Sequence, residues 1–380
     1  MVSRKIAGIS PFIVMEVLER AAEMERKGAN VIHLEVGEPD FDAPACVSKA
    51  VGEAFKQGHT HYTHSLGDPE LRQEIVKKYK SDYGASISDE QIIITSGSSP
   101  AILLTLAVLC NNHDEVILSD PGYACYPNFI KFIGAKAVKV PVYEDDGFQY
   151  RPSEIKKYIN TKTKAIMINS PMNPTGNLLP EEVMGELTTL GPPIISDEIY
   201  HGLVYKGKAH SILEFSGDAF VLNGFSKLYA MTGLRLGYVI APPAYVRAMQ
   251  KIQQNLFICA GSTAQRAGIA ALRYAGGDIR QMKRTYNERR IFIIRRLKEL
   301  GFNIRVEPTG AFYVFVNAKH LSKNSYKLAF DILEKAHVGV TPGIDFGENG
   351  EGFLRFSYAN SLDNIKEGMD RLESYLSGLL

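Results

Sequence analysis

The chain has 380 residues, with 43 Lys and Arg against 42 Asp and Glu, a formal net charge of +1. This balance disfavours a nucleic-acid or membrane-surface partner, and a hydrophobic fraction of 45% with 22% charged residues argues against disorder. Four scattered cysteines without a C-x-x-C pair argue against a zinc ribbon or a disulfide scaffold and indicate a reducing, cytoplasmic compartment. The longest apolar run, residues 101–110, is too short to span a membrane.

The first two thirds of the chain alternate between strand and helix patterns. Apolar spacing predicts a helix at 12–27 and a short strand at 31–36. Short β-branched runs then predict strands at 92–95, 115–119, 137–141, 165–169, 193–196, 219–223 and 237–240. Strands that alternate with helices indicate an α/β fold with a mostly parallel sheet covered by helices on both faces. Ligands of such sheets bind at the carboxyl ends of the strands.

The last third follows a different order, which predicts a second, smaller α+β domain. Residues 275–278 interrupt the helical pattern, and a long helix is expected at about 279–300 with Met282, Ile291, Ile294 and Leu297 on its apolar side. Strands at 302–306 and 311–316 flank 307–310 as a hairpin. A helix at 325–336, strands near 338–341 and 353–357, and a helix at 361–377 follow. We expect a large domain at 45–285 and a small one formed by 1–44 and 286–380.

Lys227 lies just after a predicted buried strand, beside Ser226 and close in sequence to Arg235. A lysine at a strand end is most simply a surface residue. The alternative is a lysine whose neutral amine attacks an aldehyde, with Arg235 helping to lower its pKa.

Two further strand ends carry polar residues. Asp197 ends an apolar strand and Tyr200 follows three residues later, so one turn can direct both side chains at a ligand. A helix N-cap explains Asp197 equally well but leaves Tyr200 unexplained. Asn173 lies in a turn between Pro171 and Pro174, which is either an ordinary loop or a rigid support for its amide.

The remaining candidates are a loop that can bind a phosphate, a tyrosine at the sheet edge, and an arginine that can bind a carboxylate. Small residues at 96–99 precede a helix, where free backbone N–H groups and the helix dipole favour a phosphate, although the Walker A lysine is absent. Tyr123 follows the strand at 115–119 and is expected at the same sheet edge. Arg355 lies inside an apolar strand, where a ligand carboxylate would pair with it through two hydrogen bonds.

In this order, these motifs resemble the class I/II aminotransferases, pyridoxal-phosphate enzymes of fold type I in the aspartate aminotransferase superfamily. The stretch 226–238 is similar to the cofactor-lysine signature of that family, and 37–41 and 61–72 also match. The resemblance extends from about residue 11 to the C-terminus. It implies an aminotransferase that uses pyridoxal 5'-phosphate and moves an amino group from an amino acid to a 2-oxo acid.

The resemblance also implies roles for individual residues, with no metal. Lys227 would form a Schiff base with the cofactor and then carry the proton, as the catalytic residue with Asp197 and Tyr200. Asp197 would bind the pyridine nitrogen, Tyr200 and Asn173 the phenolic oxygen, and Tyr123 the ring face. The residues implied at the cofactor phosphate are Gly97, Ser98, Ser99, Ser226 and Arg235.

The same resemblance implies a partner subunit and a substrate pocket. Tyr62 would reach the phosphate of the neighbouring subunit in a homodimer with shared sites. Arg355 would bind the substrate α-carboxylate, with Gly37 and Asn173 close to it and Ile13 near the substrate side chain. The Asp120–Pro121 and Asn173–Pro174 peptide bonds are expected to be cis.

Substrate choice and reaction type are less constrained. Residues 100–112 contain no Lys or Arg, and 11–14 are apolar, which favours apolar or aromatic donors, or alanine, over aspartate. The expected acceptor is 2-oxoglutarate or pyruvate. A C–S lyase or another amino-acid lyase would use the same residues. A cofactor-binding transcription regulator is disfavoured, because the family motifs begin near Pro11 and the net charge does not favour DNA.

Overall fold

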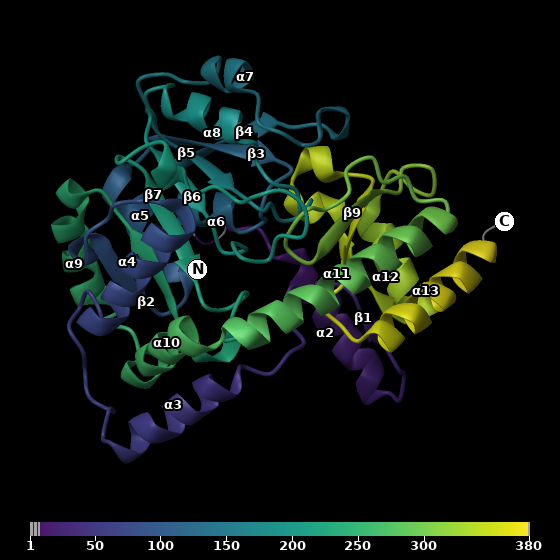
Figure 1. The fold of residues 1–380 in the computed structure, drawn as a ribbon. Helices are drawn as coiled ribbons and strands as arrows, with labels where there is room; N and C mark the ends of the chain where they lie inside the picture. Colours follow the sequence, from purple (N-terminus) through teal and green to yellow (C-terminus); the bar gives the residue numbers. More distant parts are fainter. Residues whose placement is uncertain (1–2, 4–5, 7, 379–380) are drawn as a thin grey trace.

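The computed structural model describes residues 3, 6 and 8–378, and a seven-stranded sheet forms the centre of its larger part (Figure 1). The strand order is β2-β8-β7-β6-β5-β3-β4. The strands are β2 (Ile92–Thr95), β3 (Glu115–Asp120), β4 (Lys136–Pro141), β5 (Thr163–Asn169), β6 (Ile194–Asp197), β7 (Phe220–Gly224) and β8 (Gly237–Ile240). All neighbours are parallel except β8, which is antiparallel to both β2 and β7. The predicted α/β fold with a mostly parallel sheet is confirmed.

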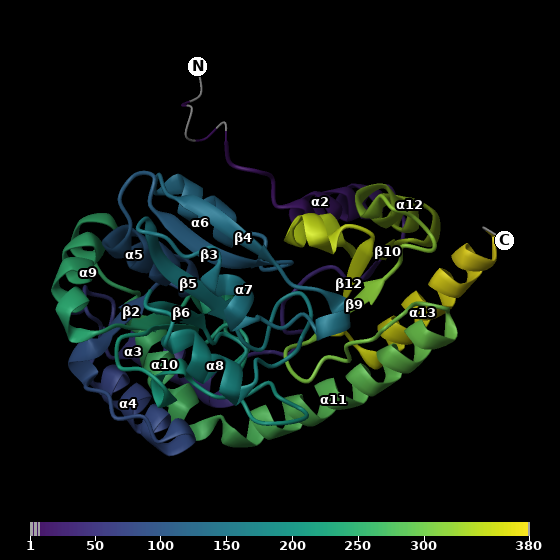
Figure 2. The ribbon, with the colours of Figure 1, turned by 90° about the horizontal axis from the view of Figure 1, so that it is seen from above.

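Helices cover both faces of this sheet because its strands are apolar on both sides. Ile92 and Ile94 belong to one buried cluster and Ile93 to another, since successive side chains point to opposite faces. Figure 2 shows α5 and α6 on one side and α4, α8 and α10 on the other. The helices are α3 (Ala45–Lys56), α4 (Pro69–Tyr83), α5 (Ser98–Leu109), α6 (Tyr126–Phe132), α7 (Pro152–Lys156), α8 (Glu181–Thr188), α9 (Pro243–Leu256) and α10 (Ser262–Tyr274).

The smaller part joins the two ends of the chain. An antiparallel sheet of order β11-β12-β9 packs with a two-stranded parallel pair, β1 and β10. Its strands are β1 (Ile32–His33), β9 (Tyr313–Asn317), β10 (Val338–Gly339), β11 (Thr341–Pro342) and β12 (Phe353–Ser357). Its helices are α2 (Ile13–Arg26), α12 (Ser325–Ala336) and α13 (Leu362–Ser377). The long helix α11 (Gly276–Glu299) runs from the larger part to the smaller one (Figure 2).

The predicted hairpin at 302–316 is wrong. Residues 302–306 form no strand beyond a single bridge between Asn303 and Asn317, and β9 begins only at Tyr313. The backbone N–H groups of Thr309 and Gly310 instead donate to the carbonyl of Gly176, at 2.9 and 2.8 Å. The backbone of the expected turn therefore binds the larger part of the molecule rather than closing a hairpin.

Three smaller expectations also differ from the structure. The interruption expected at 275–278 is limited to Ala275, because α10 ends at Tyr274 and α11 already begins at Gly276. Ile291 is 56% exposed rather than on the apolar side, and Arg289 and Arg290 are buried in its place. The strand predicted at 31–36 is reduced to β1, since residues beyond His33 turn towards the sheet edge that carries Arg355.

Other backbone expectations agree with the structure. The Asp120–Pro121 and Asn173–Pro174 bonds are cis as predicted, and so is Ser170–Pro171. Across residues 3, 6 and 8–378, no helix has both the length and the apolar character that crossing a bilayer requires. The outermost residues of the expected small domain, 1–2, 4–5, 7 and 379–380, lie outside the described residues.

Candidate active site

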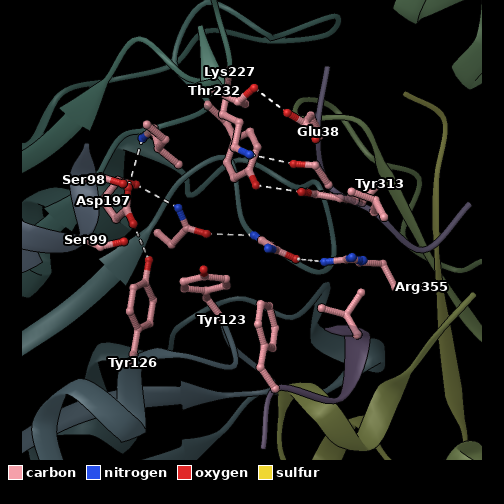
Figure 3. A pocket seen from close by; sticks show the side chains of 18 of the residues that line it. Glu38, Ser98, Ser99, Tyr123, Tyr126, Asp197, Lys227, Thr232, Tyr313 and Arg355 are labelled. Carbon is pink, nitrogen blue, oxygen red and sulfur yellow. Dashed lines mark hydrogen bonds between the residues drawn. The ribbon is translucent and has the colours of Figure 1, made fainter. Parts of the chain in front are cut away.

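One cavity lies where the carboxyl ends of β5, β6 and β7 face the smaller part of the molecule. Its volume is about 1080 Å³ including its open mouth. Nine of the sequence-predicted residues line it: Gly37, Ser98, Ser99, Tyr123, Asn173, Asp197, Tyr200, Lys227 and Arg355. Figure 3 shows that Lys227, Asp197, Tyr123 and Arg355 converge on it from different elements. The convergence follows from topology, because parallel strands end at the same edge of a sheet.

Lys227 lies just after β7, with its amine inside the cavity wall. Its Nζ donates to the carbonyl oxygen of Gly37 at 2.6 Å. The pKa of Lys227 is lowered to about 8, mainly by burial; the charges of Arg355 and Arg235 contribute to the lowering, while Glu38 and Asp197 oppose it. The expected influence of Arg235 is therefore present, but desolvation is the larger cause. A substantial fraction of this amine is neutral near pH 8.

Asp197 ends β6 with its carboxylate directed into the same cavity. One oxygen accepts from the hydroxyl of Tyr126 at 2.6 Å, and the other accepts from the backbone N–H of Ile199 at 3.1 Å. Burial raises the pKa of Asp197 to about 6. Sequence reasoning missed Tyr126, although its position three residues after Tyr123 places both rings on one side of a helical turn.

Tyr200 and Arg355 are linked through a residue that the sequence did not single out. The hydroxyls of Tyr200 and Tyr313 are 2.8 Å apart. The guanidinium of Arg355 lies over the Tyr313 ring, 4.3 Å from its centroid, and its Nη1 donates to Oδ1 of Asn173 at 2.9 Å. Tyr313 lies in β9 and Arg355 in β12, so the smaller sheet supplies one wall of a site whose other wall is the larger sheet (Figure 3).

The loop before α5 has the features of an anion-binding turn. Gly97 has a φ of 90°, and a Cβ there would lie 2.5 Å from Nη2 of Arg235. No side chain caps the N-terminus of α5, so its first backbone N–H groups are free to bind a ligand. Arg235 and Ser226 do not themselves line the cavity, and Arg235 is exposed.

Two further predicted residues, Tyr62 and Ile13, also lie outside the lining of the cavity in this chain. Tyr62 is 83% exposed and outside it. Ile13 lines a neighbouring hollow with Asp345. The reason is that α2 begins at Ile13, whose N–H donates to the Asp345 carboxylate at 2.9 Å, and its neighbours in the same turn face the site instead. The residues of that segment in the cavity wall are Phe12, Val14, Met15 and Leu18.

Glu38 and Thr232 form a further pair in the cavity wall that sequence reasoning did not assign. The Thr232 hydroxyl donates to the Glu38 carboxylate (Figure 3). Glu38 comes directly after Gly37, whose carbonyl binds Lys227, and Thr232 comes shortly after Lys227 itself. The pair therefore links the segment that carries the lysine to the segment that binds its amine. The carboxylate also places a negative charge in the wall.

Comparison with known proteins decides the family. A family model described as aminotransferase class I and II matches residues 29–372. The chain belongs to the class I and II aminotransferases. It is a transaminase of fold type I that uses pyridoxal 5'-phosphate and transfers an amino group from an amino acid to a 2-oxo acid.

Related aminotransferases match over their full length but differ in their substrates. The (5-formylfuran-3-yl)methyl phosphate transaminase of Methanocaldococcus jannaschii is 41% identical over 99% of this chain and 100% of its own. An aspartate aminotransferase of Pyrococcus horikoshii is 40% identical over 96% and 94%. A crystal structure from Methanococcus jannaschii, described as similar in its active site to kynurenine aminotransferases, has a TM-score of 0.93 at 40% identity and covers 99% of this chain and 100% of that one.

The Tyr126–Asp197 hydrogen bond predicts a shift in the acid limb of this aminotransferase. Tyr126→Phe removes a donor that stabilises the ionised carboxylate, so the pKa of Asp197 should rise further above its ordinary value. If activity needs ionised Asp197, it falls as the pH drops through that pKa. The acid limb of the kcat/KM profile should therefore move to higher pH. Tyr143→Phe, which changes an exposed tyrosine, serves as the control, and an unmoved limb in Tyr126→Phe would contradict the assignment.

Proposed function

We propose that Lys227 is the residue that bonds the cofactor and carries the proton in this aminotransferase. The observation that supports this most directly is its buried amine, with a pKa of about 8, at the meeting point of both walls of the cavity. A neutral amine is needed to attack a carbonyl carbon and to accept a proton. Since Nζ donates only to the carbonyl of Gly37, it can release this bond without leaving a buried ion pair broken.

The residues around Lys227 fit pyridoxal 5'-phosphate. Asp197 would bind the pyridine nitrogen, and its bond from Tyr126 keeps the carboxylate ionised for that purpose. Tyr200 and Asn173 would donate to the phenolic oxygen, and Tyr123 would cover the ring face. The phosphate would be held by Gly97, Ser98, Ser99, Ser226 and Arg235, at the uncapped N-terminus of α5. When bound, the cofactor supplies a carbonyl carbon and a ring that withdraws electrons from the substrate α-carbon.

Arg355 would bind the α-carboxylate that all donors and acceptors share. Its guanidinium is buried, and its Nε has no partner in the described structure. Its other bonds go to the neutral oxygens of Asn173, Thr341 and the Glu35 backbone. A carboxylate would add the missing negative charge, and Gly37 leaves room for it beside Tyr313, whose hydroxyl would lie 2.0 Å from a Cβ on Gly37.

We also propose that the protein is cytoplasmic and that it forms a homodimer. A homodimer with shared sites would give a role to Tyr62, whose ring is 83% exposed in the single chain. The expected division into 45–285 and the terminal segments 1–44 and 286–380 would fall within α11, which spans both parts. The four cysteines are free thiols, as a cytoplasmic protein would keep them.

The cavity wall favours neutral donors over aspartate. Phe12, Met15, Leu18 and Ile102 give it an apolar side. Among the described residues that line the cavity, Lys227 and Arg355 are the only lysine and arginine. Lys227 is assigned above to the cofactor, and Arg355 to the α-carboxylate that every substrate shares. Glu38 adds a negative charge, which would repel the second carboxylate of aspartate.

Lys227→Ala and Arg355→Ala should fail in different ways. Lys227→Ala should keep cofactor through non-covalent contacts but lose the visible absorbance that depends on the bond to lysine. Turnover should fall well beyond the roughly 10²–10⁴-fold of general acid–base catalysis alone. Arg355→Ala should keep that absorbance and raise KM for every amino-acid donor alike. The measurements are absorbance spectra and steady-state kinetics with alanine, phenylalanine and aspartate, after circular dichroism has verified folding.

Two results would contradict these assignments. Near-normal turnover by Lys227→Ala would exclude Lys227 as the proton carrier. An effect of Arg355→Ala confined to aspartate would show that Arg355 binds the side-chain carboxylate of the substrate rather than its α-carboxylate. Product analysis in the same assays separates transamination, which yields a new amino acid, from a lyase reaction, which yields pyruvate and ammonia.

The donor preference is tested on the native enzyme and one variant. kcat/KM for phenylalanine should exceed that for aspartate by about tenfold or more, because an unpaired carboxylate against an apolar wall costs more than the roughly 1–3 kcal/mol of an unpaired neutral polar group. Glu38→Gln keeps the size of the side chain and removes its charge, so it should narrow the difference. Aspartate turning over faster than all neutral donors would overturn the proposal.

A further inference from the structure

The segment that precedes Gly37 supports both cations of the site. The carbonyl oxygen of Glu35 accepts from Nη2 of Arg355 at 2.5 Å and from the hydroxyl of Thr341 at 3.0 Å. Two residues later, the carbonyl of Gly37 accepts from Lys227 at 2.6 Å. The position of this short segment therefore helps to set where the Arg355 guanidinium lies.

The side chain of Glu35 is unusual for its surroundings. It is fully buried, with one carboxylate oxygen 2.6 Å from Nδ1 of His33 and the other without any hydrogen-bond partner. It occupies the space over Gly339, where a Cβ would lie 2.1 Å from the unpartnered oxygen. A buried carboxylate is costly unless a cation pairs with it. In the described structure, His33 is the only ion-pair partner within 4.0 Å of Glu35.

His33 connects this buried carboxylate to the surface. Its Nε2 lies 3.1 Å from the carboxylate of Glu25 on α2, so the ring bridges one exposed and one buried glutamate. The hydrogen bond to Glu35 is the main cause that raises the pKa of His33 to about 9, against the opposing effect of burial. The imidazole is therefore charged at neutral pH and supplies the cation that Glu35 needs.

The other elements packed around His33 do not compete for it. Asn360, just before α13, donates to the His33 backbone carbonyl and carries no charge. Arg371 of α13 binds Asn30 and Glu367 instead. On the α12 side, the neighbouring titratable residue is His337, whose backbone carbonyl accepts from the N–H of Ile32 at 2.9 Å.

We propose that His33 and Glu35 are positioning residues for Arg355: the charge of His33 balances the buried Glu35 carboxylate, so that the backbone of residues 33–37 stays in place with the Glu35 carbonyl on the guanidinium. This proposal rests on the assignment of Arg355 to the substrate carboxylate. Neither side chain touches substrate. When the charge of the Glu35 carboxylate is balanced, the side chain stays fixed in its buried position and holds the backbone carbonyl of the same residue in place.

The pair should act on substrate binding rather than on the chemical step. Because the pKa of His33 is raised, the pair is intact at neutral pH and is lost as the pH rises through about 9. Loss of the proton leaves Glu35 buried without a cation, and its segment then relaxes away from Arg355. The KM of a carboxylate substrate should rise, while kcat, which depends on Lys227, should change little from this cause.

The test is a double-mutant cycle on the holoenzyme, with the KM of pyruvate measured from pH 7 to 10. Pyruvate carries no amine that titrates in this range. The native KM should rise about tenfold above pH 9, the weight of one charge-assisted hydrogen bond. His33→Gln should show the raised KM already at pH 7. Glu35→Gln, which removes the unpaired charge, should stay within about threefold of the native KM at pH 7 and remain flat to pH 10.

The double variant carries the sharpest expectation. His33→Gln with Glu35→Gln should behave like Glu35→Gln alone, because the lost cation matters only while the buried carboxylate is present. Should His33→Gln fold poorly, Glu35→Gln and the double variant still decide the question. Histidine titration by NMR gives an independent readout: the His33 pKa should fall in Glu35→Gln.

His210→Gln is the matched control. His210 also bridges two glutamates, Glu181 and Glu214, but it lies outside the active-site cavity. The KM of pyruvate for His210→Gln should equal that of the native enzyme at every pH. Any pH dependence that comes from Lys227 is common to all variants and is therefore measured by this control.

The outcomes separate this proposal from the function it rests on. If Arg355→Ala leaves the KM of pyruvate unchanged, the assignment of Arg355 fails and this proposal with it. If Arg355→Ala raises that KM but His33→Gln leaves it native at pH 7, or the double variant is no better than His33→Gln, only the positioning role is overturned.

Discussion

The burial of Arg355 is the constraint on which the two-part architecture of the site depends. Its side chain is 2% exposed, and no described carboxylate lies within ion-pair distance of it. A guanidinium in this position needs acceptors from several directions, and they come from Asn173 in the turn after β5 of the larger sheet, Thr341 of the smaller sheet and the backbone of Glu35. The two sheets therefore meet around one cation whose charge is still unbalanced, which is the property expected of a carboxylate-binding site.

The second desolvated cation of the site, Lys227, lies in the wall formed by the larger sheet. Lys227 shares its surroundings with Arg355, and the charge of Arg355 disfavours the protonated amine of the lysine. Keeping Arg355 charged thus helps to keep Lys227 ready to lose its proton. The segment from His33 to Gly37 touches both groups, which explains how an ion pair outside the cavity can influence binding inside it.

The sequence predicts the parts of this site that topology controls. Asp197 and Lys227 each follow a β-branched run, and strands of one mostly parallel sheet end at a common edge, so the order of strands and helices along the chain is enough to predict their convergence. Arg355 could be singled out because a cation inside an apolar strand requires a partner. The resemblance of these motifs to one enzyme family supplied their roles.

Contacts between the two parts of the molecule could not be predicted in this way. Tyr313 lies in an ordinary apolar strand, and only its approach to Tyr200 from the other sheet makes it part of the site. The turn before it, residues 307–310, has a hairpin-like sequence, but its conformation is set by the hydrogen bonds of Thr309 and Gly310 to Gly176. Ile13 illustrates the limit of local pattern, since the sequence does not show which residues at the start of α2 face the cavity and which face the neighbouring hollow with Asp345.

The claim that Arg355 holds the common carboxylate is tested most directly by removing that carboxylate from the substrate. The measurement compares phenylalanine with phenethylamine in single-turnover reactions of the native holoenzyme and of Arg355→Ala, followed by cofactor absorbance. If the guanidinium binds the carboxylate, phenethylamine should react far more slowly than phenylalanine with the native enzyme, and this difference should largely disappear in the variant. An equal difference in both enzymes would show that another group binds the carboxylate and would contradict the account.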